Sequence, residues 1–275
     1  FLLKIYTPHP LLQHLVSCYR IIYFGNDPVF RQPWVVSPTG SNTLAILVSP
    51  ASVVDIGRKE KHSARIRFSG QTDEVKYFTS EAIVNSEILV ELKPGAAFEL
   101  FGIPQNNFTN KWIEVDDFLP DTAMFYNQLD DCGLDIDSMI PIVDNWLLQM
   151  AVRSKNKPKT EILMAMQHIM TSSGQMDIVQ LRNKVGMTRA SFQNHFKQQI
   201  GVSPKTYSRI VRANAAYKEI QQIKDVDWQQ VTYDLRYFDQ SHFIKDFKHF
   251  FGCTPSDLHR GGFYLSQFLY KPDDY

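Results

Sequence analysis

Apolar and polar positions follow two different periods along the chain. In residues 1–120 the apolar residues form short runs, and Gly40, Gly57, Gly70 and Gly95 separate them. Short apolar runs bounded by turn residues are typical of β-strands. We therefore expect strands at 43–48, 52–56 and 64–68 and two more within 83–92, which together predict a sandwich or a small barrel.

The pattern becomes helical near residue 120. Asp121 is the expected N-cap of a helix over about 122–130. A second helix is expected over 136–152, where six apolar residues fall at helical spacing: Ile136, Met139, Ile140, Val143, Leu147 and Met150. This apolar stripe fits either a partner helix in a homodimer or the core of its own domain, with Ile142 and Trp146 widening the apolar face.

A basic segment interrupted by proline, residues 153–159, is the predicted interdomain linker. The expected fold class is therefore α+β with two domains. A β-rich sensor or dimerisation domain, barrel or sandwich-like, covers residues 1–152. An all-α domain covers residues 160–260, and residues 261–275 form a C-terminal tail.

The C-terminal region contains an internal repeat. One copy runs from Phe192 to Pro204 and the other from Phe243 to Pro255, and each reads F-x3-F-K-x3-G-x-(S/T)-P. The copies are offset by 51 residues, whereas apolar residues upstream of them match at an offset of 50. A one-residue difference in the turn that precedes each copy explains this slip.

Each copy predicts a short helix, a tight turn and a second helix. In the first copy we expect Gly186 to take a positive φ and Thr188 to cap the second helix, and in the second copy Asp239 is the expected cap. The phenylalanines four residues apart face inward, while the opposite face is polar and rich in hydrogen-bond donors. This arrangement predicts two helix-turn-helix units.

A helix of about 20 residues is expected to connect the two units. Ser203 is its predicted N-cap and Pro204 its first residue. Such a helix spans roughly 30 Å, and successive major-groove faces of duplex DNA lie about 34 Å apart. The two units are thus expected to enter adjacent major grooves.

Residues of about 160–260 resemble the DNA-binding domain of the AraC/XylS family of bacterial transcription regulators. The resemblance rests on the Gly201-Val-Ser-Pro-Lys-Thr-Tyr207 run, on Arg209 and Arg212, and on Phe238-Asp-Gln-Ser-His-Phe243. Two positions depart from the family pattern: Arg182 replaces the usual alanine, and Arg236 replaces the usual glycine of the second turn.

This resemblance, together with the polar outer faces, predicts how the protein contacts double-stranded DNA. The candidate base contacts are Arg189, Ala190, Gln193, Asn194, Gln240, Ser241, His242 and Lys245. The candidate phosphate contacts are Lys197, Lys205, Arg209, Arg212 and Lys248, and Arg189 is also placed to reach a phosphate. For each of these residues the alternative is an ordinary solvated surface position.

The resemblance also implies an N-terminal domain that binds a small effector or serves only for dimerisation. A homodimer and RNA polymerase are the further candidate partners. Five aromatic residues either line an effector pocket or belong to the core: Tyr19, Tyr23, Phe24, Trp34 and Trp112.

Charge and composition agree with a nucleic-acid partner for the second domain only. Residues 1–150 carry 11 basic and 18 acidic groups, a net charge of −7, whereas residues 159–260 carry 14 and nine, a net charge of +5. The three cysteines form no CxxC pair and the N-terminal histidines no H-x-H pair. We therefore expect no enzyme activity, no metal and no cofactor, and a cytoplasmic protein without a membrane span.

Overall fold

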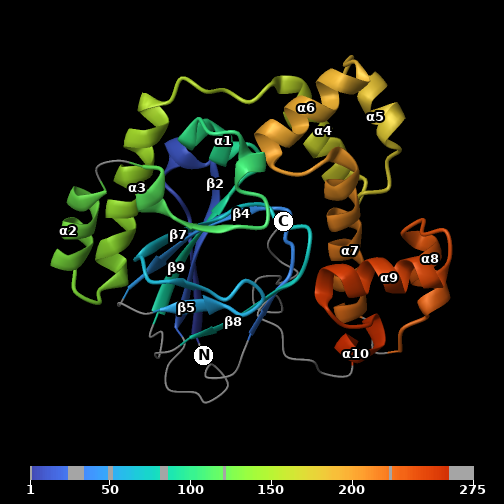
Figure 1. Cartoon of the computed structure of the whole chain (residues 1–275), viewed down its shortest axis with the longest axis horizontal. Helices are drawn as coiled ribbons and strands as arrows, with labels where there is room; N and C mark the ends of the chain where they lie inside the picture. The colour runs from blue at the N-terminus through green and yellow to red at the C-terminus, as the bar shows by residue number, and fades with distance from the viewer. Residues whose placement is uncertain are drawn as a thin grey trace.

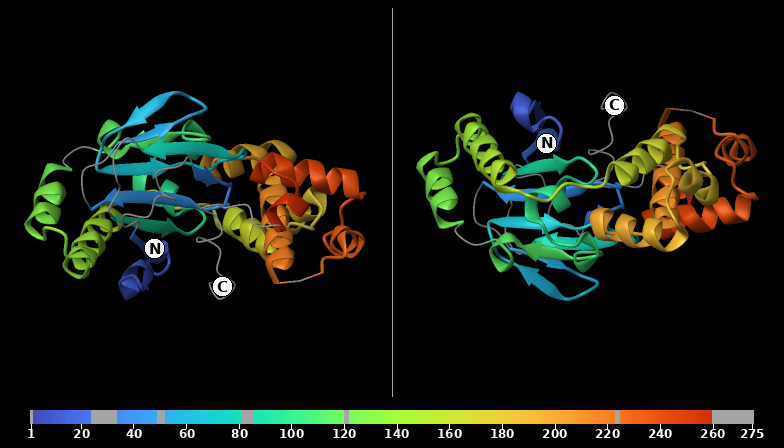
Figure 2. Two further views of the ribbon diagram at one scale, coloured as in Figure 1. Left: turned by 90° about the horizontal axis from the view of Figure 1, so that it is seen from below. Right: turned by 90° about the horizontal axis from the view of Figure 1, so that it is seen from above.

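The computed structural model describes residues 2–23, 34–48, 52–80, 86–119, 122–222 and 225–259. A β-rich domain carrying three α-helices comes first, and the described residues from 160 onward form helices and turns (Figure 1). The two parts lie side by side, with helix α7 (Pro204–Gln222) between the sheets and the last helices of the chain. Figure 2 shows the same arrangement from two further directions.

The described strands form two antiparallel sheets. The larger has the order β1 (Leu2–Tyr6), β2 (Val16–Tyr23), β9 (Ser86–Leu92), β4 (Asn42–Leu47), β7 (Ile66–Ser69) and β10 (Trp112–Glu114). The smaller has the order β3 (Trp34–Val36), β8 (Lys76–Ser80), β5 (Val53–Asp55) and β6 (Glu60–His62). Because these strands make two separate sheets, the domain is a sandwich and not a closed barrel.

Three of the expected strands are present with small shifts, and the described part of 83–92 forms one strand where two were expected. The predictions at 43–48, 52–56 and 64–68 correspond to β4, β5 and β7, and β9 occupies the second half of 83–92. Residues 83–85 lie outside the described ranges, as does Asp121, the expected cap of the first helix. That helix, α2, begins at Ala123.

One face of the larger sheet is apolar and covered by helices. Tyr19, Val90, Leu44 and Phe68 succeed one another across this face, because each is the register partner of the next. Side chains of directly opposed residues lie on the same face. Three helices pack there in one hydrophobic core: α1 (Ala96–Phe101), α2 (Ala123–Asp131) and α3 (Ile136–Arg153).

The apolar stripe of α3 belongs to this core. Five of its members, Ile136, Met139, Ile140, Val143 and Leu147, are at most 7% exposed, and Met150 packs beside them. The stripe therefore packs against its own domain and offers no free surface to a partner helix. Of the two interpretations of the stripe, the structure supports the core.

The opposite face of the larger sheet carries buried charges. Arg20 pairs with Glu91 at 2.5 Å, and Arg67 pairs with Glu87 at 2.7 Å. The smaller sheet covers part of this face, since Phe78 of β8 stacks on Trp112 of β10 with ring centroids 3.7 Å apart. The interior between the sheets is thus polar and aromatic rather than uniformly aliphatic.

The C-terminal part contains seven helices within its described residues. They are α4 (Thr160–Thr171), α5 (Ile178–Lys184), α6 (Arg189–Ile200), α7, α8 (Trp228–Asp234), α9 (Gln240–Phe251) and α10 (Pro255–His259). One hydrophobic core surrounds Phe192 and Phe196, and another surrounds Phe243 and Phe247. Helix α7 contributes to both cores. No helix of the described part is apolar over a stretch long enough to cross a membrane.

Residues 154–159, which lie within the predicted linker, join α3 to α4 without forming a helix or strand, and Arg153 is the last residue of α3. They are nevertheless held in place. The Ser154 hydroxyl donates a hydrogen bond to the carbonyl of Glu99, and the Lys157 ammonium pairs with the Glu99 carboxylate. The connection therefore follows the surface of α1.

Polar contacts also join the two domains directly. The Thr109 hydroxyl donates to the carbonyl of Gly201 at 2.6 Å. The Asn214 amide, on α7, donates to the carbonyls of Pro38 and Thr39 at 3.1 and 3.3 Å. The β-domain thereby contacts the helix that connects the two helix-turn-helix units.

Candidate nucleic-acid interface

The first unit consists of α5, a turn and α6. Asp177 caps α5 by accepting the backbone N–H groups of Val179 and Gln180, both at 2.9 Å. Gly186 then takes a φ of 69°, a value that favours glycine. The Thr188 hydroxyl accepts the N–H of Ser191 at 3.3 Å and so caps α6. The predicted turn glycine and the predicted cap are both confirmed.

Helix α6 presents its donors outward. Phe192 and Phe196 are buried on its inner face. Of the five predicted contacts on this helix, four are exposed and Gln193 is half-buried; the exposed ones are Arg189, Ala190, Asn194 and Lys197. Most of the predicted contacts on this face are therefore accessible from outside the domain.

The second unit, α8 and α9, repeats the design. Asp227 caps α8, and the Asp239 carboxylate caps α9 by accepting the N–H of His242 at 2.7 Å. The phenylalanines of α9 are buried. The five predicted contacts on its other face are all exposed: Gln240, Ser241, His242, Lys245 and Lys248.

The two turns differ by one residue, as the repeat predicted. The N–H of Met187 bonds the carbonyl of Arg182 in the first turn, and the N–H of Tyr237 bonds the carbonyl of Thr232 in the second. These equivalent bonds end each first helix. In the first unit the N-cap follows directly, whereas in the second Phe238 is inserted before it.

Arg236 occupies the position equivalent to Gly186 and takes a φ of 52°. For a residue with a side chain, this left-handed conformation costs about 1 kcal/mol. The second turn thus has the same left-handed residue as the first turn, at the cost of local backbone strain. The departure from glycine at this position has not changed the course of the chain.

Helix α7 begins as predicted. The Ser203 hydroxyl accepts the N–H of Thr206 at 3.0 Å, and the helix extends over 19 residues from Pro204. Its length is therefore about 28 Å. Lys205, a predicted phosphate contact in its first turn, is exposed.

The two arginines of α7 have partners inside the domain. Arg209 makes a bidentate pair with Asp246 of α9, with nitrogen–oxygen distances of 2.8 and 3.2 Å. Arg212 donates two hydrogen bonds to the carbonyl of Gly174, the shorter at 2.7 Å. Hydrogen bonding to Asp246 raises the pKa of Arg209 above its usual value.

Asp246 was not singled out in the sequence, although it is the acceptor that fixes Arg209. Its position three residues after Phe243 places it toward the inner face of α9, where its side chain is only 5% exposed. A carboxylate on the apolar side of a helix requires a partner. The three-residue spacing between Phe243 and Asp246 was therefore the feature of the sequence that could have identified Asp246.

Residues 181–261 match a family model described as a helix-turn-helix domain. The match begins within α5, includes the rest of the first unit and all of the second, and extends just past α10. The C-terminal domain is a helix-turn-helix domain of the AraC type. A helix-turn-helix domain is a DNA-binding motif that places its second helix in the major groove. No curated protein sequence matches the chain.

Several solved structures of ToxT from Vibrio cholerae are similar in fold. An apo variant is 9% identical, with a TM-score of 0.48, covering 88% of this chain and 97% of ToxT. ToxT bound to (E)-4-(8-methylnaphthalen-1-yl)but-3-enoic acid is 8% identical, with the same score and coverage. ToxT bound to an unsaturated fatty acid is 10% identical, with a TM-score of 0.45, covering 88% of this chain and 93% of ToxT.

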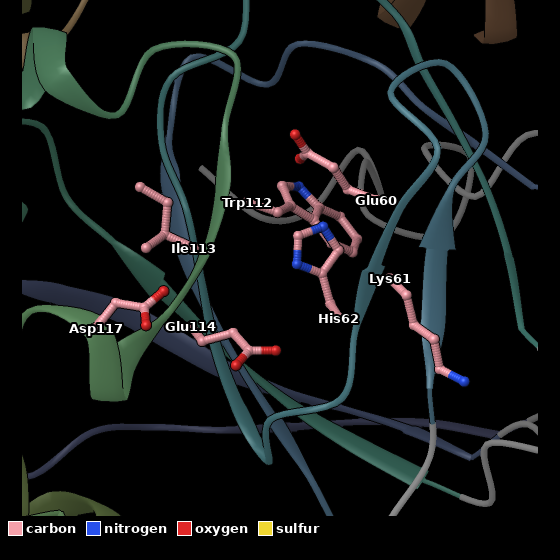
Figure 3. Close-up of a pocket in the computed structure, with 7 residues that line it drawn as sticks. All are labelled: Glu60, Lys61, His62, Trp112, Ile113, Glu114 and Asp117. Atoms are coloured by element: carbon pink, nitrogen blue, oxygen red, sulfur yellow. The ribbon is translucent and has the colours of Figure 1, made fainter.

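The N-terminal domain contains a pocket of about 370 Å³ beside β6 and β10. Seven residues line it: Glu60, Lys61, His62, Trp112, Ile113, Glu114 and Asp117. Figure 3 shows the rings of His62 and Trp112 lying close together in this pocket, with Glu60 and Glu114 nearby. The guanidinium of Arg67 lies 5.4 Å from the centre of the Trp112 ring.

Several buried nitrogen atoms around this pocket lack a hydrogen-bond partner. They are Nε2 of His62, Nε1 of Trp112, and Nε and Nη1 of Arg67. Burial, and then the charge of Arg67, lower the pKa of His62. Buried polar atoms normally have hydrogen-bond partners. The guanidinium and indole nitrogens can only donate, whereas Nε2 of a neutral imidazole can donate or accept.

The aromatic residues considered for a pocket separate into different roles. Trp112 lines the pocket, and Trp34 stacks on Phe78 at 6.2 Å. Tyr19 is fully buried in the core and donates its hydroxyl proton to Asp144, while Tyr23 packs at the edge of that core. Phe24 lies outside the described residues.

Proposed function

We propose that the regulator reads two successive major grooves with α6 and α9. The observation that carries this proposal is the pairing of two capped helices, each with an exposed donor-rich face, through one continuous helix of 19 residues. Its length of about 28 Å is close to the groove repeat of about 34 Å. The net positive charge of residues 159–260 supports the same partner.

The proposed readout follows from side-chain chemistry. Gln193 and Asn194 can each bond the N6 and N7 edge of adenine, Lys245 and His242 can bond guanine, and Ser241 can bond either base. Arg189, Ala190 and Gln240 complete the proposed base-facing set. Exposed Lys197, Lys205 and Lys248 are the proposed phosphate contacts.

Arg209 and Arg212 have a different proposed role. Because both guanidinium groups bond to other parts of the domain, we propose that they position α9 and the α4–α5 connection relative to α7. They would then affect DNA binding by positioning the helices. The proposed phosphate contacts are accordingly the three exposed lysines alone.

Selection of bound duplexes from a random pool tests the base-reading proposal. We expect Gln193→Ala and Lys245→Ala each to relax specificity at one or two base pairs, with the two affected positions about 10 bp apart. Each good base contact contributes about 1–3 kcal/mol of discrimination. Gln221→Ala, an exposed glutamine at the end of α7, is the matched control. Identical site preferences for wild type and both variants would reject these roles.

The N-terminal domain is proposed to bind a small effector in the pocket beside β6 and β10. The unpartnered N–H groups of Arg67 and Trp112 support a ligand with acceptor oxygens, and the Trp112 ring, which Phe78 holds in place by stacking, suits its flat part. Glu60 and Glu114 are placed to accept hydrogen bonds from ligand hydroxyl or amine groups.

Thermal-shift screening of the full chain against small polar metabolites tests this site. Trp112→Phe removes one donor and keeps an aromatic ring against Phe78. We expect a bound compound to raise the melting temperature of wild type clearly more than that of Trp112→Phe. An equal shift in both proteins would place the ligand elsewhere, and an effector-independent domain would show no shift with any compound.

Homodimerisation and contact with RNA polymerase are further proposed interactions of the regulator. A second copy would extend the DNA footprint and raise avidity. Sedimentation of the full chain at micromolar concentration measures the first of these. Because the α3 stripe is buried, a dimer would use a surface other than that stripe.

A further inference from the structure

Phe238 is the most exposed large apolar residue among the described positions. Its side chain is 92% exposed, and it directly precedes Asp239, the N-cap of α9. Single exposed apolar residues are common on protein surfaces and need no explanation by themselves. Here the position matters, because the N-terminal end of a recognition helix is the part that contacts base edges.

The packing of α9 does not depend on the Phe238 side chain. The residue before an N-cap commonly packs against the fourth residue of the helix, which in α9 is Phe243. Tyr237 does this instead, with its ring 5.2 Å from that of Phe243. In the first unit Met187 packs on the core that contains Phe192, and its N-cap follows at once.

Phe238 is therefore the extra residue of the second turn, displaced from the core by Tyr237. Exposed donors follow it at Gln240, Ser241 and His242, on the surface that the proposed function assigns to DNA. An aromatic ring in a donor-rich major-groove surface can make contacts that these donors cannot. The 5-methyl group of thymine is the apolar group that the major groove offers, and phenylalanine is among the side chains that contact it.

We propose that Phe238 is a specificity-determining residue that contacts the 5-methyl group of a thymine at the edge of the α9 site. This inference rests on the proposed function, since it requires α9 to lie in the major groove. The contact adds a preference that no hydrogen-bonding side chain of α9 supplies. It also distinguishes the second unit from the first, which lacks an equivalent residue.

The test uses the full chain and the duplex selected by it. Each thymine of the α9 half-site is replaced singly by deoxyuridine, which lacks only the 5-methyl group, and dissociation constants are measured for wild type and Phe238→Ala. Loss of one buried methyl contact corresponds to about a four-fold weaker affinity. We expect that loss at one or two positions for wild type and its absence at the same positions for Phe238→Ala.

Two controls keep the result interpretable. Tyr233→Ala removes another aromatic residue, 78% exposed on α8, and should keep the wild-type response to deoxyuridine. Melting temperatures should be equal for Phe238→Ala and wild type, because the ring packs on little. Equal deoxyuridine effects in wild type and Phe238→Ala would overturn the proposal. The proposal would also be overturned if Phe238→Ala bound DNA with wild-type sequence preference but lost transcription activation, because that result would indicate a contact with another protein. Failure of wild type to select any duplex would instead refute the proposed function.

Discussion

Replacing Arg209 by methionine separates two roles that the sequence does not distinguish. Methionine keeps an unbranched stem against Phe250, whose ring centre lies 5.2 Å from the Arg209 guanidinium, but removes the charge. Asp246, with a side chain only 5% exposed, then loses its bidentate partner. His242 Nε2, at 3.8 Å, is the other cationic group near this carboxylate when the imidazole is protonated.

The magnitude follows from the burial of the two groups. Removing one partner of a fully buried pair costs about 3–5 kcal/mol. The Arg209 side chain is 36% exposed, so water already screens this pair and will solvate Asp246 in part. We therefore expect Arg209→Met to destabilise the contact between α7 and α9 by about 2 kcal/mol, with the backbone fold of each helix retained.

Hydrogen exchange in the full chain measures this loss where it occurs. A loss of about 2 kcal/mol corresponds to roughly 30-fold faster exchange of the slowest amides in α7 and α9. A phosphate contact would instead lower the slope of log affinity against log salt by about 0.9. For Arg209→Met we expect faster exchange and an unchanged salt slope. For the exposed control Lys205→Met we expect unchanged exchange and a reduced salt slope. Unchanged exchange with a reduced slope for Arg209→Met would refute the positioning role.

Further predictions address the turn, the domains and the core. Arg236→Gly should stabilise the chain by about 0.5–1 kcal/mol, since it relieves a positive φ; a lower melting temperature would show that the arginine side chain contributes more than the strain costs. The isolated fragment 159–260 should bind the selected duplex with steep salt dependence, and a folded fragment that shows no mobility shift would contradict the domain assignment. Leu147→Glu should unfold or aggregate the N-terminal domain, whereas a folded monomer in sedimentation would indicate an interface. Because burial and Arg67 lower the pKa of His62 in the folded state, the unfolded state takes up a proton first as pH falls below about 6.5. Thermal melts at pH 7.5 and 5.5 should therefore show an acid destabilisation that is smaller in His62→Gln.

Local rules explain which parts of the DNA-binding domain could be predicted. A glycine after a short helix and a hydroxyl or carboxylate before the next one determine turn and cap geometry within a few residues. Gly186, Thr188, Asp239 and Ser203 accordingly stand where the sequence placed them. The repeat offset likewise located the extra turn residue before the structure identified it as Phe238.

The remaining features depend on contacts between distant segments. Arg209 and Arg212 look like phosphate ligands in sequence because both are basic and follow the start of α7. Their actual partners are a buried carboxylate 37 residues away and the carbonyl of Gly174. Local periodicity places Asp246 toward the inner face of α9, but it does not identify which distant residue pairs with it. The α3 stripe is ambiguous for the same reason, because an apolar helix face looks identical whether it packs on its own sheet or on a partner.

The arrangement of β3 and β8 connects the pocket with the DNA-binding helices. Phe78 of β8 faces inward onto Trp112, while its neighbour Tyr77 lies against the end of α9, where a Cβ added at Gly252 would be 2.5 Å from the tyrosine oxygen. Trp34 of β3 stacks on Phe78, and the chain after β3 supplies the carbonyls that accept hydrogen bonds from Asn214 of α7.

An effector changes DNA affinity only if it binds one arrangement of the two domains better than another. The domain interface is suited to such a change, because Oδ1 of Asn214 and the side-chain oxygens of Gln71 and Gln105 are buried there without partners. Unpaired buried acceptors destabilise the arrangement in which the two domains are in contact. They bring its free energy closer to that of an arrangement in which the domains are apart. A ligand that moves the Phe78–Trp112 stack would shift β3 and β8 together. The contacts on the connecting helix α7 and at the end of the recognition helix α9 would then change at the same time.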